Sequence, residues 1–148
     1  MKVQKDYEEF LELLNRSNVK YVIVGSYALA YHAKPRYTKD MDIFIEPTVE
    51  NATAILQAIK DFGFPEINLT SEDIIEEDKM VQLGYEPVRI DILSSLSGCT
   101  FSEVWNNRIK GKYGDTEVYF IRKDDLIKNK RASGRKQDIV DIDLLKNT

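Results

Sequence analysis

Two aspartates inside an apolar stretch constrain the fold of this chain more than any other feature. Asp40 and Asp42 lead into the apolar residues 43–45, a pattern typical of a buried strand. Side chains at positions i and i+2 of a strand point to the same side, so both carboxylates share one face of a sheet. A buried carboxylate without a partner is costly, and this face therefore requires cations.

A third acid interrupts another strand-like segment. Asp91 lies within residues 88–93, which also contain Arg89 but are otherwise apolar. If this strand lies beside the one that carries Asp40 and Asp42, three carboxylates converge on one point. Oxygen ligands suit Mg²⁺, a hard cation that proteins commonly share with substrate phosphates. The residues alone therefore predict a magnesium site.

A Gly-Ser pair follows the apolar residues 21–24. We expect a strand to end at Gly25 and a helix to follow, with Ser26 as its cap. Glycine lets backbone approach a ligand closely, and the free N–H groups at the start of a helix favour a phosphate. Most turns of this kind are only turns, but this one precedes the strand with two acids. Thr38 has the parity of those acids, so we expect it on the same face if the extended conformation begins before Asp40.

Composition limits the kind of protein. The 148 residues suit one domain that spans residues 1–148, and 43% hydrophobic with 31% charged residues is typical of a globular protein. A net charge of −4 argues against an extended nucleic-acid surface. Cys99 is the only cysteine, which excludes an internal disulfide. No apolar run approaches the roughly 20 residues that span a bilayer. Because the charged N-terminus also has no apolar signal segment, we expect a cytoplasmic protein without a membrane partner.

Hydrophobic periodicity predicts an α+β fold, with a mixed β-sheet flanked by helices. Thr48 and Thr100 have the spacing of helix caps, and Gly63 and Gly134 the spacing of helix ends. The expected strands are residues 20–24, 41–46, 80–83, 88–93 and 116–121. The expected helices are residues 7–14, 26–32, 49–62, 71–77, 101–109, 124–134 and 136–146.

The order of these motifs resembles a known superfamily. A Gly-Ser pair at a helix start, then Asp-x-Asp on a strand, then a single Asp on a later strand, is the pattern of the polymerase-beta-like nucleotidyltransferases. Four further blocks resemble small bacterial proteins usually labelled uncharacterised nucleotidyltransferases, some of them filed near the toxins of abortive-infection toxin–antitoxin systems. These blocks are residues 81–84, 87–93, 98–105 and 126–135, and the resemblance covers about residues 19–145.

The resemblance implies a fold, a reaction and a set of roles. A nucleoside monophosphate moves from an NTP, ATP included, to an acceptor hydroxyl, and pyrophosphate leaves. Asp40 and Asp42 bridge two Mg²⁺ ions, with Mn²⁺ as the alternative, and Asp91 binds the ion nearer the acceptor. Gly25 and Ser26 hold the β- and γ-phosphates. The acceptor is a small molecule, a protein or an RNA end. The chain departs from the superfamily pattern in one respect, because Asp40 follows Ser26 by fourteen positions, a longer interval than usual.

Two groups of cations allow alternative interpretations. A basic cluster lies between residues 128 and 136, and it is either a solvated helix face or a binding surface for the triphosphate or the acceptor. In the second case Lys130 and Arg135 are the expected contacts. Arg89 either pairs with Asp91, two residues away, or contacts the leaving group. Asp138 and Asp141 are expected on a helix surface, paired with the basic cluster.

Three functions remain open at this point. The first is an active Mg²⁺-dependent nucleotidyltransferase. The second is a toxin–antitoxin component that modifies a tRNA or a partner protein and has a small cognate partner. The third is a non-catalytic nucleotide-binding module, which the presence of Asp40, Asp42 and Asp91 argues against.

Overall fold

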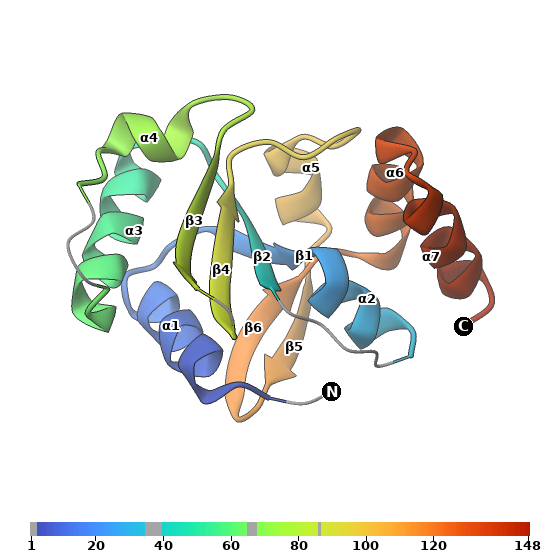
Figure 1. Cartoon of the computed structure of the whole chain (residues 1–148), viewed down its shortest axis with the longest axis horizontal. Helices are drawn as coiled ribbons and strands as arrows, with labels where there is room; N and C mark the ends of the chain where they lie inside the picture. The colour runs from blue at the N-terminus through green and yellow to red at the C-terminus, as the bar shows by residue number, and fades with distance from the viewer. Residues whose placement is uncertain (1–2, 35–39, 65–67, 86) are drawn as a thin grey trace.

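The computed structural model describes residues 3–34, 40–64, 68–85 and 87–148. Helices surround a six-stranded mixed sheet (Figure 1). The helices are α1 (Lys5–Arg16), α2 (Gly25–His32), α3 (Val49–Phe62), α4 (Ser71–Ile75), α5 (Phe101–Asn106), α6 (Lys123–Ser133) and α7 (Lys136–Lys146). The strands are β1 (Tyr21–Val24), β2 (Asp40–Ile45), β3 (Met80–Tyr85), β4 (Val88–Leu93), β5 (Ile109–Tyr113) and β6 (Thr116–Phe120).

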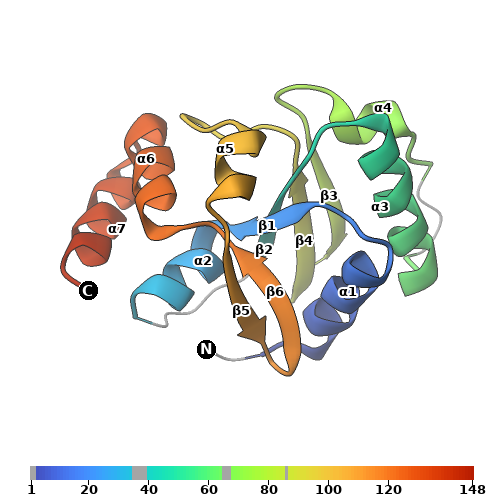
Figure 2. The same ribbon diagram turned by 180° about the vertical axis from the view of Figure 1, so that it is seen from behind.

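The sheet has the strand order β3-β4-β2-β1-β6-β5. Strand β2 runs antiparallel to β1 and parallel to β4, and β1 runs parallel to β6. Each outer strand is joined to its neighbour as an antiparallel hairpin. Helices α6 and α7 lie side by side at one end of the molecule, and α3 and α4 lie at the other (Figure 1 and Figure 2). The expected α+β fold with a mixed sheet flanked by helices is therefore confirmed.

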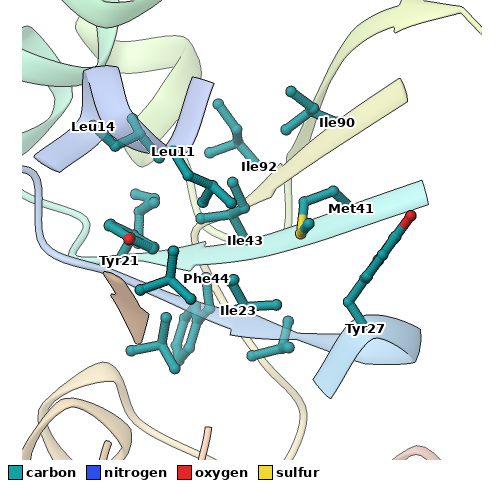
Figure 3. Packing of buried hydrophobic residues seen from close by; sticks show 14 of the residues in the cluster. Leu11, Leu14, Tyr21, Ile23, Tyr27, Met41, Ile43, Phe44, Ile90 and Ile92 are labelled. Carbon is teal, nitrogen blue, oxygen red and sulfur yellow. The ribbon is translucent and has the colours of Figure 1, made fainter. Parts of the chain in front are cut away.

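The core determines which face of the sheet carries the acids. Leu11 and Leu14 of α1 pack near Ile43 and Ile92, which point to one face (Figure 3). Phe44 points to the opposite face, where its ring lies 5.2 Å from that of Phe101 in α5. The acids of β2 alternate with the residues that face α1, so they share the face of Phe44. The face that carries the acids is therefore the one covered by α5.

Some helix boundaries agree with the sequence-based expectation, and others do not. The Thr48 hydroxyl accepts a hydrogen bond from the Asn51 N–H at 3.2 Å, and Gly63 ends the same helix in a left-handed conformation with φ of 90°. Helix α2, however, already begins at Gly25 with Val24 in the cap position. Ser26 therefore lies inside the first turn, and its expected role as a cap was wrong.

Strand β5 was missed by the sequence analysis. Residues 101–109 were expected to form one helix, but α5 ends at Asn106 and Ile109 begins β5. Ile109, Gly111 and Tyr113 alternate inward with exposed lysines, so this segment has a strand period that the helical pattern obscured. Pairing along the whole of β6 stabilises the strand, and this tertiary contact decides the local structure.

No helix in the four described ranges combines the length and apolarity needed to cross a membrane.

Asn51 is predicted to be the most sensitive polar residue away from the site. Its buried amide accepts from the Lys20 N–H at 2.8 Å and donates to the carbonyls of Lys20 and Glu46, both at 3.0 Å. Asn51→Ala leaves the Lys20 N–H without this partner and removes one of two donors from each carbonyl, since the Lys20 carbonyl also accepts from the Glu46 N–H and the Glu46 carbonyl from the Thr48 N–H. It should therefore lower the free energy of unfolding by about 2–3 kcal/mol. Urea denaturation measures this, with Asn147→Ala at the exposed end of α7 as the matched control. Equal stability of the two variants would contradict the prediction.

Candidate active site

Strands β2 and β4 bring the acids together. They pair in parallel with Asp42 opposite Asp91 and Asp40 opposite Arg89. Opposed residues of a parallel pair point to the same face, so all three acids lie on one side of neighbouring strands. The expectation that the strand of Asp91 lies beside that of Asp40 and Asp42 is confirmed.

Arg89 is held by the acids around it. Its Nε and Nη2 donate to the two carboxylate oxygens of Asp91 at 3.0 and 3.1 Å, and its Nη1 lies 3.8 Å from Asp40 Oδ2. Of the two interpretations for Arg89, the structure therefore shows pairing with Asp91. Tyr7 fixes the backbone at this point, because its hydroxyl donates to the Arg89 carbonyl at 3.0 Å and accepts from the Arg89 N–H at 3.1 Å.

The acidity of Asp42 is strongly perturbed. Burial, followed by the charges of Asp91 and Asp40, raises the pKa of Asp42 from 3.8 to about 7, and Arg89 opposes the shift. Asp42 also shares a hydrogen bond with Asp91. Such strongly shifted groups gather at functional sites.

Gly25 is required by the acid beside it. Its φ is +67°, and a Cβ at this position would stand 3.1 Å from the Cβ and Cγ of Asp42 and still closer to Oδ2. The sequence analysis assigned Gly25 to close phosphate contact, and the structure adds a second reason for glycine. Any side chain here would displace the Asp42 carboxylate, so a substitution of Gly25 disturbs the acid together with whatever lies at the start of α2.

A buried ion network joins α6 to α7. Lys130 is 6% exposed, and its Nζ lies 2.9 Å from Asp141 Oδ2 and 3.6 Å from Asp138 Oδ1. The exposed Arg135 side chain donates from Nε to Asp138 Oδ2 at 3.0 Å. Asp138 and Asp141 are each 1% exposed, so the expected pairing with the basic cluster is confirmed and the expected surface position was wrong.

Two adjoining pockets meet at Asp42. Both are lined by Gly25, Asp42, Lys130 and Arg135. One, of about 240 Å³, also contains Ser26 and the acids of the ion network, and we call it the ionic pocket. The other, of about 330 Å³, extends toward the end of β4 and the loop after it. The structure thus brings five of the residues singled out from the sequence to one place, because Ser26 lies with these four.

One expected site residue is not placed, and several residues of the site were not expected. Thr38 lies outside the described residues. Tyr7 and Gln137 were not singled out, since neither belongs to a recognisable motif. Gln137 donates to Asp141 Oδ1 at 2.9 Å and lines the ionic pocket. The serines at positions 95 and 97 were also missed, although a polar run directly after a strand is a usual sign of a site loop.

The three acids differ from a preformed metal site in how they are grouped. Among the described residues, no three acidic, histidine or cysteine side chains are grouped closely enough to hold a metal ion. Arg89 occupies both carboxylate oxygens of Asp91 instead. The donor chemistry still fits, because the three acids offer only oxygen ligands, and a hard cation would be attracted by the charges of Asp91 and Asp40, which come second to burial in raising the pKa of Asp42. A cation at Asp91 would compete with Arg89.

The family of the chain follows from a comparison with known families. Residues 1–146 match the model of the family described as "Nucleotidyltransferase of unknown function (DUF6036)". The chain belongs to this family. The nucleotidyltransferase assignment made from the motifs is thereby confirmed, and the protein is an enzyme of this class.

The fold is also similar to that of a solved structure. The crystal structure of the lincosamide antibiotic adenylyltransferase LnuA with lincomycin bound aligns with a TM-score of 0.62 and 19% sequence identity. The alignment covers 97% of this chain and 96% of that one. At this identity the likeness establishes the shared nucleotidyltransferase fold. No curated protein matches the chain.

Asp42 should make stability depend on pH when metal is removed. Its carboxyl keeps a proton in the folded protein up to a pKa of about 7, whereas the unfolded chain loses it near 3.8. Raising the pH between these values favours the unfolded chain, because that state binds fewer protons. Relative to wild type, Asp42→Asn should therefore become progressively more stable from pH 4 to 7, and the difference should level off above pH 7. Urea denaturation in the presence of a chelator measures this, and a difference that does not change with pH would refute it.

Asp141 should be essential for joining α6 to α7. Asp141→Asn leaves the buried Lys130 ammonium without its closest charged partner, and breaking a buried ion pair typically costs about 3 kcal/mol or more. Asp143→Asn, two residues along and exposed on the same helix, should change stability by less than ~0.5 kcal/mol. Thermal or urea denaturation compares the two variants. Similar stabilities would mean that the network contributes little.

Proposed function

We propose that this enzyme transfers a nucleoside monophosphate from an NTP to an acceptor hydroxyl, with release of pyrophosphate and with Mg²⁺ or Mn²⁺ as cofactor. One observation carries the proposal. Asp42, opposite Asp91 and with a raised pKa, lines the same pockets as the start of α2 and the cations of α6 and α7. Acids that attract a metal and groups that attract phosphate thus meet at one carboxylate, as nucleotidyl transfer requires.

The phosphate-binding part of the proposal rests on Gly25, Ser26, Lys130 and Arg135. The backbone N–H groups at the start of α2 and the partial positive charge of the helix favour an anion. Lys130 is already held in place by Asp141, so its ammonium loses little freedom when a phosphate arrives. Arg135 donates from Nε and Nη2 to the two carboxylate oxygens of Asp138, and the remaining N–H groups of its guanidinium would contact a phosphate.

Asp40, Asp42 and Asp91 would hold the metal. The cation would neutralise charge on the phosphates and on the acids. Asp42 would lose its proton when the cation binds, because an adjacent positive charge favours the ionised carboxyl. Arg89 orients the Asp91 carboxylate through two hydrogen bonds, and Asp91 in turn would orient the acceptor hydroxyl or accept its proton.

A small-molecule acceptor has the strongest support. LnuA is an adenylyltransferase with an antibiotic bound, and its fold extends over nearly the whole of this chain. The net charge of −4 disfavours a long nucleic-acid acceptor. A protein acceptor, an RNA end and a role beside a small cognate partner are alternatives for the same chemistry. An NTP substrate also favours a cytoplasmic reaction.

Transfer of label from an NTP is the direct test. The protein is incubated with each α-³²P-labelled NTP, Mg²⁺ or Mn²⁺ and a cell extract, and both small molecules and macromolecules are examined for label. We expect label in an acceptor and pyrophosphate in solution. Asp42→Asn and Asp91→Asn should each reduce the rate at least a hundredfold, about 2.7 kcal/mol of activation free energy. Asp124→Asn, exposed at the start of α6, is the control.

Two results together would refute the proposal. One is the absence of labelled product with every NTP. The other is a melting temperature that does not respond to millimolar Mg²⁺ or Mn²⁺, since a ligand that binds the folded state must stabilise it.

A further inference from the structure

The larger of the two pockets at Asp42 has a lining unlike that of a phosphate site. Beyond the residues that it shares with the ionic pocket, its walls carry three hydroxyls, one amide and the apolar side chains of Val24 and two leucines. We call it the serine pocket, and its distinguishing residues are Leu93, Ser95, Leu96, Ser97, Asn129 and Ser133.

The outer wall of the serine pocket is pressed against α6. A Cβ on Gly98 would stand 2.7 Å from the Ala132 Cβ and 3.2 Å from the Lys128 carbonyl oxygen, so the loop after β4 approaches the helix as closely as a glycine allows. The Asn129 amide donates to the Ser97 carbonyl at 3.0 Å. Further along, the Cys99 thiol lies 3.6 Å from the Asp125 carbonyl oxygen. Contacts within the protein itself therefore hold the wall in place.

The two pockets divide the chemistry of a nucleotide between them. The ionic pocket offers the start of α2 and the cations Lys130 and Arg135, which suit phosphates, beside the acids Asp138 and Asp141 that pair with these cations. The serine pocket offers hydroxyl and amide groups between apolar side chains, which suit a base and a ribose. Gly25, Asp42, Lys130 and Arg135 line both, so one molecule can extend from one pocket into the other.

We infer that the serine pocket binds the nucleoside half of the NTP, while the triphosphate lies in the ionic pocket. This inference rests on the proposed function. With the α-phosphate beside Asp42, the nucleoside attached to it can enter the serine pocket, the second of the two pockets that the described residues form at this carboxylate. The volume of about 330 Å³ is in the range of small-ligand sites.

Filling the serine pocket tests the inference. Ser133 is exposed in the last turn of α6, so Ser133→Phe can project a ring into the pocket without disturbing the core. The control is Ser102→Phe, the same change at an exposed position of α5. Two probes are titrated calorimetrically in buffer with Mg²⁺. One is whichever of ATP, GTP, CTP and UTP binds wild type most tightly, and the other is inorganic tripolyphosphate.

The expected result is a difference between the probes. Ser133→Phe should weaken NTP binding at least tenfold and leave tripolyphosphate binding within twofold of wild type. Ser102→Phe should change neither. Asn129→Ala, which releases the loop at Ser97, should weaken NTP binding in the same selective way. Retained tripolyphosphate binding also verifies that each variant is folded.

Other results would overturn the inference and identify the reason. Unchanged NTP affinity in Ser133→Phe, with label transfer lost, would assign the pocket to the acceptor. Equal weakening of both probes would mean that the substitution acts on the phosphate site. If wild type binds neither tripolyphosphate nor any NTP, the proposed function fails as well.

Discussion

The pairing of β2 with β4 is the constraint on which the rest of the site depends. Its register sets Asp42 against Asp91 and Asp40 against Arg89, so like charges are held at close range by backbone hydrogen bonds. The sheet cannot relieve this repulsion by moving, because β2 and β4 both lie inside it. The repulsion is reduced in two other ways. The raised pKa of Asp42 lets this carboxyl keep a proton, and Arg89 donates two hydrogen bonds to Asp91. A bound cation would reduce the remaining repulsion between the carboxylates.

On the side of α6 and α7, a buried ion network positions the residues of the site. Lys130 and the acids at positions 138 and 141 form an ion network inside the contact between α6 and α7. Burying such groups gives little net stability but strongly disfavours any arrangement in which one partner is missing. The relative position of the two helices is thereby specified, and with it the ionic pocket. The cations Lys130 and Arg135 thus line the same pockets as Asp42.

Local sequence patterns predicted the parts of the fold that depend on neighbouring residues. The cap at Thr48 and the glycine that ends α3 follow from short-range chemistry, and the acids of β2 follow from strand alternation. Strand β5 was missed because its partner decides its structure. The burial of Asp138 and Asp141 was also missed, because a helix that carries acids looks solvent-facing until another helix is packed on it. The serine pocket was missed for the same reason, because the loop after β4 and the part of α6 that form its walls are about 30 residues apart in the chain.

The contact between Tyr7 and Arg89 has a consequence for how the site forms. One hydroxyl satisfies both backbone groups of a residue 82 positions away, and so fastens the first helix to the strand that carries Asp91. Closing so long a loop is slow relative to making local contacts. The acids should therefore reach their final places only when the N-terminal helix docks, which makes assembly of the site a late and cooperative event in folding.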